Sequence, residues 1–212
     1  MLTIIVHELT TYFCERLENK DDINSFRAGV KECAKILSSL AGMQNQRFPP
    51  RDAKIVVQSV FKFNRGSNLR DQKAATRLSL LELMQTLIRL YKSNLVTNIG
   101  SKEFVEGIVA MAEFEKDPTC LNVLFPIYEE LGKQWDLGED ALVPIWDSFI
   151  RYYPIKIGGR ATSVPTPDQL KQLLLDCFIS NDCYAKFAFP RLMELLDTDQ
   201  DLSANVKVWL LR

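Results

Sequence analysis

The stretch SKEFVEGIVAMAEFEKDPTCLNVLFPIYEELGKQ, residues 101–134, decides the fold class of this chain. In its first half, Phe104, Ile108 and Met111 stand at i, i+4 and i+7, the spacing that gathers apolar side chains on one face of a helix. The second half repeats the spacing with Leu121, Leu124, Phe125, Tyr128 and Leu131. The stretch therefore predicts two amphipathic helices in succession.

Asp117 and Pro118 separate these two helices. Pro118 cannot continue the first helix, because its ring fixes φ and it has no N–H to donate, but it suits the first turn of the next helix. Asp117 is well placed to cap that helix with its side chain. The unit is thus a helical hairpin, and its uncovered apolar side needs a neighbour of the same kind.

The rest of the chain repeats this plan. Further apolar helical periods cover residues 1–17, 23–40, 51–62, 69–92, 139–152 and 167–179, and another begins near residue 183. The first of these helices is expected to bury Ile5, Leu9, Phe13 and Leu17, and Asp22 is expected to cap the second. The helix over residues 69–92 is expected to bury Leu80, Leu83, Met84, Leu87, Leu90 and Tyr91.

The helix pairs follow one another at a spacing of about 40–47 residues, which is typical of HEAT repeats. They group into approximate units 1–42, 49–93, 101–134, 138–180 and 183–212. No alternating apolar pattern with turn dipeptides indicates a strand. We therefore predict an all-α fold, a right-handed α-solenoid of about five HEAT-type hairpins. We expect it to be a single array and a fragment of a longer solenoid.

Composition narrows the classes of function. With 47% hydrophobic residues among 212, the chain can bury a continuous core. Its 26 Lys and Arg balance 27 Asp and Glu, so no strong positive field favours direct binding of nucleic acid. No apolar run reaches the roughly 18 residues of a membrane-spanning helix, and the N-terminal MLTIIVHELTTYF lacks the basic start of a signal peptide. We expect a soluble intracellular protein that contacts neither nucleic acid nor membrane.

Cysteines and aromatic residues are expected in the core. The cysteines are Cys14, Cys33, Cys120, Cys177 and Cys183, all within apolar helical periods and without a C-x-x-C pair. Their odd number and their scatter favour reduced, buried thiols of a cytoplasmic or nuclear protein over disulfides or a zinc site. Trp146, Phe149, Tyr152 and Tyr153 stand at spacings that favour burial over base stacking.

The sequence offers no catalytic constellation. A Ser-His-Asp or Cys-His triad would depend on His7, the single histidine, for which a surface or helix-capping role is expected. Four glutamates stand close enough in sequence to suggest paired catalytic carboxylates: Glu113, Glu115, Glu129 and Glu130. They are expected to be ordinary charges on solvated helix faces. We predict no catalytic, cofactor-binding or metal-binding residue and no cofactor.

Residues 153–166, YPIKIGGRATSVPT, form the longest predicted loop. The Gly158-Gly159 pair lacks the flanking pattern of a phosphate-binding loop, so a flexible turn is the simpler interpretation. The alternative is that the loop contacts a protein partner. The residues of that contact would be Tyr153, Pro154, Lys156 and Arg160.

Several segments, in the same order along nearly the whole chain, resemble a known family. They are YFCERLENKDD, KIVVQSVF, FVEGIVAMAEFEKDPTCLNVLFPIYEEL, the Tyr153-Pro154-Ile155 element, PDQLKQLLLDCFISN and FAFPRLMELLD. The resemblance is to the N-terminal HEAT-repeat domain of the large targeting subunit of cytosolic iron–sulfur protein assembly. That family is also named for methyl-methanesulfonate sensitivity and methionine auxotrophy, as a DNA repair and transcription protein.

The resemblance implies a curved, non-catalytic adaptor of the cytoplasm and nucleus. Such an adaptor brings apo iron–sulfur enzymes of DNA replication, repair and transcription to the other subunits of an iron–sulfur targeting complex. The repeat pattern fits a general HEAT adaptor equally well, such as a transport receptor or a subunit of a transcription complex. An enzyme is the third class, and no constellation of residues supports it.

Overall fold

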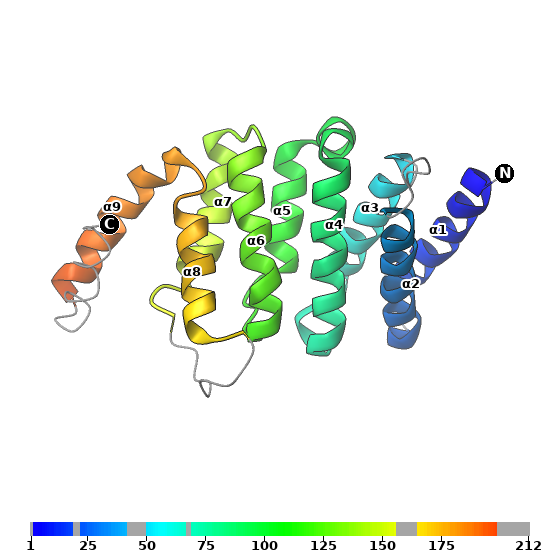
Figure 1. The fold of residues 1–212 in the computed structure, drawn as a ribbon, viewed down its shortest axis with the longest axis horizontal. Helices are drawn as coiled ribbons and strands as arrows, with labels where there is room; N and C mark the ends of the chain where they lie inside the picture. Colours follow the sequence, from blue (N-terminus) through cyan, green and yellow to red (C-terminus); the bar gives the residue numbers. More distant parts are fainter. Residues whose placement is uncertain (1, 19–21, 42–49, 67–68, 156–164, 199–212) are drawn as a thin grey trace.

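The computed structural model describes residues 2–18, 22–41, 50–66, 69–155 and 165–198, and these residues are largely helical and contain no β-strand. Figure 1 shows the helices side by side in a long array, with α1 and α9 at its opposite ends. The helices are α1 (Leu2–Glu18), α2 (Ile23–Ala41), α3 (Pro50–Gly66), α4 (Ala74–Ile99), α5 (Ser101–Met111), α6 (Pro118–Gln134), α7 (Glu139–Ile150), α8 (Pro167–Phe178) and α9 (Ala185–Thr198). Two 3₁₀ turns, η1 (Leu69–Asp71) and η2 (Asp182–Tyr184), precede α4 and α9.

The helices form two layers. In one layer α2, α4, α6 and α8 follow in order, since each packs on the next (Figure 1). In the other layer α1 packs on α3, α3 on α5, and α5 on α7. Contacts of α1 with α2 and of α3 with α4 join the layers. The predicted all-α helical repeat solenoid is confirmed, whereas its right-handedness and its division into five units stay predictions.

Local capping chemistry starts the helices where the sequence indicates. The Asp117 carboxylate accepts hydrogen bonds from the backbone N–H groups of Thr119 and Cys120 at 2.9 and 3.2 Å, and Pro118 occupies the first turn of α6. The Asp22 carboxylate caps α2 by accepting from the N–H groups of Asn24 and Ser25. Both predicted caps are therefore confirmed.

The predicted end of the fourth helix near residue 92 coincides with a kink in α4. Tyr91 leaves helical geometry, with φ −126° and ψ 17°, but α4 continues to Ile99. Gly100 then turns the chain directly into α5 at φ 91°, a conformation that favours glycine. Leu90, predicted to be buried, is 50% exposed.

The predicted buried face of the first helix is also wrong in part. Ile5 and Leu9 are exposed, whereas Thr10, Cys14 and Leu17 are buried against the neighbouring helices. Apolar residues on α1 occupy two adjacent stripes. Because α1 lies at the end of the array, it packs on α2 and α3. Periodicity does not distinguish which stripe receives those neighbours.

His7 is half-buried and is neither a free surface residue nor a helix cap. Its Nδ1 lies 2.7 Å from a carboxylate oxygen of Asp52, whose side chain is fully buried in the first turn of α3. The pair therefore joins α1 to α3. A sequence separation of 45 residues hides this contact from local pattern analysis.

Gly107 allows α5 to approach α3 closely. A Cβ atom at Gly107 would overlap the ring of Phe61, which is buried and has little room to move. Helix propensity alone would make Gly107→Ala stabilising by about 1 kcal/mol. We expect the overlap to prevail, so that Gly107→Ala lowers the free energy of unfolding by about 1–3 kcal/mol in urea titrations followed by circular dichroism. Glu106→Ala, an exposed change on the same helix, is the control, and a stabilised Gly107→Ala variant would contradict the packing described.

Candidate interaction surface

The predicted partner-contact loop is described only in part. Tyr153 is half-buried, with its ring 5.8 Å from that of Phe178, and burial raises its pKa. Pro154 is half-buried, whereas Lys156 and Arg160 lie outside the described residues. Whether the four residues lie together is therefore not tested, and their role as a contact stays a prediction.

Tyr153 lines a hollow of about 350 Å³ between α8, η2 and the start of α9. Its lining is mostly apolar and includes Phe178 and Ile179, the latter largely exposed. Tyr153 itself packs on the aromatic cluster around Trp146 through Phe178. The expectation that Trp146 and Phe149 belong to the core is confirmed, and Tyr152 and Tyr153 lie at its margin.

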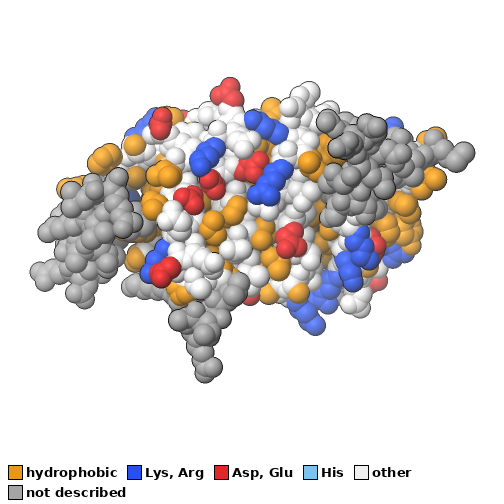
Figure 2. Space-filling view, viewed as in Figure 1, with side chains coloured by type: hydrophobic (Ala, Val, Ile, Leu, Met, Phe, Trp, Pro, Cys, Tyr) orange, Lys and Arg blue, Asp and Glu red, His pale blue; other side chains and the backbone are white. Residues whose placement is uncertain are grey.

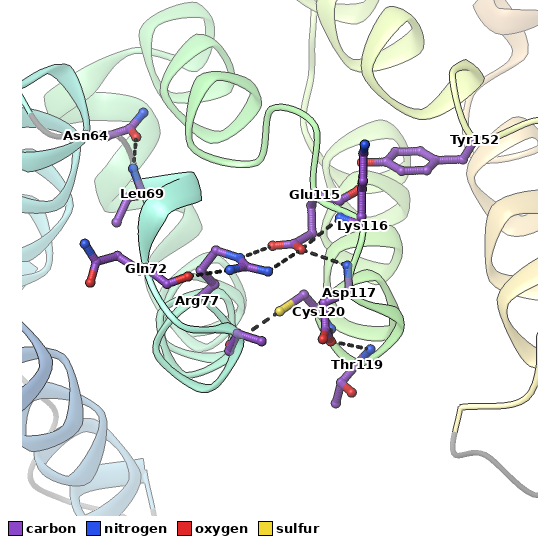
Figure 3. A network of polar contacts seen from close by, with 11 residues as sticks. Asn64, Leu69, Gln72, Arg77, Glu115, Lys116, Asp117, Thr119, Cys120 and Tyr152 are labelled. Atoms are coloured by element: carbon purple, nitrogen blue, oxygen red, sulfur yellow. Dashed lines mark hydrogen bonds and ion pairs between the residues drawn. The ribbon is translucent and has the colours of Figure 1, made fainter. Parts of the chain in front are cut away.

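A buried polar junction holds the turn between α5 and α6, as Figure 3 shows. Glu115 receives two hydrogen bonds from the Arg77 guanidinium, from Nε at 2.7 Å and from Nη2 at 2.9 Å. The same carboxylate accepts from the backbone N–H groups of Lys116 and Asp117, both at 2.9 Å. The hydroxyl of Tyr152, just after α7, donates to the Glu115 carbonyl at 2.8 Å. We call this set the Glu115 junction, and it ties α4, α5, α6 and α7 together.

The expectation that Glu115 is an ordinary surface charge is wrong, since the residue is only 7% exposed. Burial alone would raise the pKa of its carboxyl, but the hydrogen bonds from Arg77 and from the backbone N–H groups outweigh burial and lower that pKa. Glu113 is exposed as expected. Glu129 and Glu130 are partly buried, and they pair with Lys133 and Arg89 respectively.

Most of the cysteine thiols are buried. Four of the five are buried, and Cys183 is half-buried. Burial and the neighbouring carboxylates of Glu115 and Asp117 raise the pKa of Cys120 to about 12, and burial likewise raises the pKa of Cys177. A protonated, buried thiol is a poor nucleophile and a poor metal ligand. Within the described parts of the chain, no three His, Cys, Asp or Glu side chains gather as a metal site would require.

The turn that follows α5 also presents an exposed aromatic ring. Phe114 has φ 59°, a left-handed conformation that is costly for any residue other than glycine, and its side chain is 49% exposed. The guanidinium groups of Arg70, in η1, and Arg151, just after α7, each lie 5.4 Å from the centre of its ring. Together with the neighbouring exposed Lys116, these residues form what we call the Phe114 cluster.

The backbone at Phe114 can be tested by two substitutions that both remove the ring. Alanine usually stabilises a chain more than glycine, but at φ 59° only glycine avoids a steric cost. We expect Phe114→Gly to be more stable than Phe114→Ala by about 1 kcal/mol in urea unfolding. The same pair of changes at the exposed Glu106 of α5 should give the opposite order, because that residue is helical. If the alanine variant were more stable than the glycine variant at both positions, the backbone at Phe114 would not be strained.

Comparison with known proteins assigns the chain to a family. The model of the MMS19 N-terminal family, described as a Dos2-interacting transcription regulator of RNA-Pol-II, matches residues 3–208. The chain belongs to the MMS19 family. The resemblance noted in the sequence is thereby confirmed, and the match covers both the Glu115 junction and the Phe114 cluster.

Two curated relatives of the MMS19 family are similar over most of this chain. The DNA repair/transcription protein mms19 of Schizosaccharomyces pombe is 26% identical over 194 residues, which is 90% of this chain and 18% of the relative. The MMS19 nucleotide excision repair protein of Drosophila melanogaster is 24% identical over 195 residues, or 90% of this chain and 19% of the relative. This chain thus spans about a fifth of the length of these relatives. No solved structure matches the chain significantly.

Proposed function

We propose that this chain is a non-catalytic scaffold segment that acts in DNA replication, repair and transcription. It helps to deliver iron–sulfur clusters to the apoproteins of these processes, as part of a cytosolic iron–sulfur targeting complex. The cluster is cargo in this proposal, not a resident cofactor of the chain. Its partners are the other subunits of that complex and the apo client enzymes, met in the cytoplasm and the nucleus.

Membership of the MMS19 family is the observation that carries the proposal, because relatives over the same region are named for DNA repair and transcription. The architecture supports the scaffold part. A solenoid exposes faces of successive repeats side by side and so offers an extended surface to partners. Each repeat is held to the next by buried contacts, which leaves the outer side chains free to vary.

The surface of the α2–α4–α6–α8 layer is consistent with protein contacts. Figure 2 shows basic, acidic and apolar side chains interspersed over this face, without a large area of one charge. Arg89 of α4 pairs with Glu130 of α6 at 3.2 Å, and the exposed Leu90 is next to Arg89 in sequence. Such a mixed surface favours protein partners over a polyanion, whose phosphates require a row of cations.

Affinity purification of the full-length protein tests the proposal. We expect iron–sulfur assembly factors and apo iron–sulfur enzymes of DNA metabolism to co-purify, as identified by quantitative mass spectrometry against an unrelated tagged solenoid. Deletion of residues 3–208 should reduce the recovery of clients. Recovery of transcription-complex subunits without any iron–sulfur factor would instead favour a general transcription adaptor, which the family's description as a transcription regulator makes the second candidate.

A separate measurement tests whether the cluster is cargo. Purified chain, treated anaerobically with ferrous iron and sulfide and then desalted, should retain neither ion in stoichiometric amount. Retention of iron and sulfide in a fixed ratio to protein would contradict the scaffold role, because it would make the chain itself a cluster carrier.

A further inference from the structure

The Phe114 cluster is assembled from three segments that are distant in sequence. Arg70 comes from η1, Phe114 from the turn after α5, and Arg151 from the end of α7. The residue after Phe114 and the residue after Arg151 are joined by the hydrogen bond from Tyr152 to the Glu115 carbonyl. The Glu115 junction thus holds together the two chain segments that carry Phe114 and Arg151 before any partner arrives.

Beside the ring is a hollow of about 170 Å³, lined by residues of α5, of the turn that follows it and of the η1–α4 segment. Pockets for cofactors and drug-sized ligands are about 300–1,000 Å³, so this hollow suits one side chain and not a whole small molecule. Met111 and Phe114 give it apolar walls. A side chain projecting from an extended peptide would fit a space of this kind.

The charge around the hollow is positive. Arg77 and Glu115 neutralise each other within the junction. Arg70, Lys116 and Arg151 also carry positive charge around the ring and the hollow, and Glu113 carries a negative charge there. The chain as a whole carries a formal net charge of −1, so this excess is local. Guanidinium groups match carboxylates through paired hydrogen bonds, and an exposed ring beside them adds an apolar contact.

We propose that the Phe114 cluster is a docking site for an acidic linear segment of a partner protein. A carboxylate of the segment binds Arg151, and a neighbouring apolar side chain packs on the Phe114 ring beside the hollow. This inference rests on the scaffold part of the proposed function and names where a partner docks. Nucleic acid is the less favoured ligand, because a few basic groups provide no track for a phosphate backbone.

Fluorescence anisotropy with labelled decapeptides tests the site on the purified chain. The probe carries eight Asp and Glu residues around a central Leu-Phe pair, and its counterpart has Gln and Asn in their place. We expect the acidic probe to bind at least about tenfold more tightly than its counterpart. Its affinity should fall in 0.5 M NaCl. A labelled ten-nucleotide oligothymidylate should bind more weakly than the acidic probe.

Variants locate the binding. Phe114→Ala and Arg151→Gln should each lower the affinity for the acidic probe by about tenfold or more. The matched controls are Leu90→Ala, at a side chain equally exposed, and Arg65→Gln, at an exposed arginine of α3, and both should bind within about twofold of the unchanged chain. Circular dichroism confirms that each variant is folded, and Phe114→Gly provides a ring-free variant without backbone strain.

Any of three results would overturn the proposal: equal binding of both peptides, binding unaffected by the Phe114 and Arg151 changes, or tighter binding of the oligonucleotide. The assay contains no iron–sulfur component. Loss of peptide binding with retained co-purification of iron–sulfur factors would reject the docking site alone. Peptide binding at the Phe114 cluster without co-purification of iron–sulfur factors would reject iron–sulfur delivery alone.

Discussion

Glu115→Ala is expected to lower the free energy of unfolding by about 3–5 kcal/mol, since it leaves the Arg77 guanidinium without its counterion. It also removes the acceptor for the backbone N–H groups of Lys116 and Asp117. Urea titration followed by far-ultraviolet circular dichroism measures the loss. The side chain is 5% exposed, so solvent screens the interaction little.

The control for this variant is Glu113→Ala, two residues earlier in the same turn. Glu113 is exposed, and its removal should change stability by less than about 0.5 kcal/mol. Arg77→Met should destabilise the chain by a similar amount to Glu115→Ala, because it leaves the carboxylate without its cation. If Glu115→Ala were as mild as Glu113→Ala, the junction would not hold the repeats together.

Trp146→Ala is expected to cost about 3–5 kcal/mol, the usual range for removing a buried tryptophan. The Trp146 ring lies 5.3–6.0 Å from the rings of Phe149, Phe178, Tyr184 and Phe187, so it joins α7 to α8, η2 and α9. We also expect limited proteolysis to cut α8 and α9 earlier in this variant than in the unchanged chain. Such local unfolding is typical of solenoids, whose repeats depend on their nearest neighbours.

The control for Trp146 is Phe189→Ala on α9, where the ring is 62% exposed. It should alter stability by less than about 0.5 kcal/mol and leave the proteolysis pattern unchanged. Trp146→Phe should fall between the two, because it keeps part of the apolar contact. A Trp146→Ala variant that unfolds and is cleaved like the unchanged chain would show that α8 and α9 are held by other contacts.

Features that depend on a few neighbouring residues could be predicted from the sequence. The caps at Asp22 and Asp117, the helix start at Pro118 and the apolar faces of α5 and α6 all follow from spacings within a turn or two. The fold class follows from the same signals, since repeated amphipathic hairpins have few other ways to bury their faces. Family membership could be recognised because the matching segments keep their order along the chain.

Features that depend on distant residues could not be predicted. Arg77 and Glu115 are 38 residues apart, and nothing local distinguishes Glu115 from the exposed Glu113. The buried stripe of α1 depends on which side meets α2 and α3. Tertiary contacts settle both questions.

The candidate site was the least predictable feature. The loop at Tyr153 was selected by its length and composition, and it is described only in part. Phe114 was missed, because a left-handed residue after a helix is usually glycine or asparagine and the sequence gives neither there. Nothing in the short turn EFEKD indicates which residue, if any, takes the left-handed conformation.

The most direct test of the central claim measures radioactive iron in iron–sulfur enzymes of DNA metabolism. The cells would express, as the sole copy, the protein from which residues 3–208 have been deleted. We predict that iron in these immunoprecipitated enzymes falls to background, while a mitochondrial iron–sulfur enzyme keeps its iron. Unchanged iron in the enzymes of DNA metabolism would contradict a role for this segment in delivery.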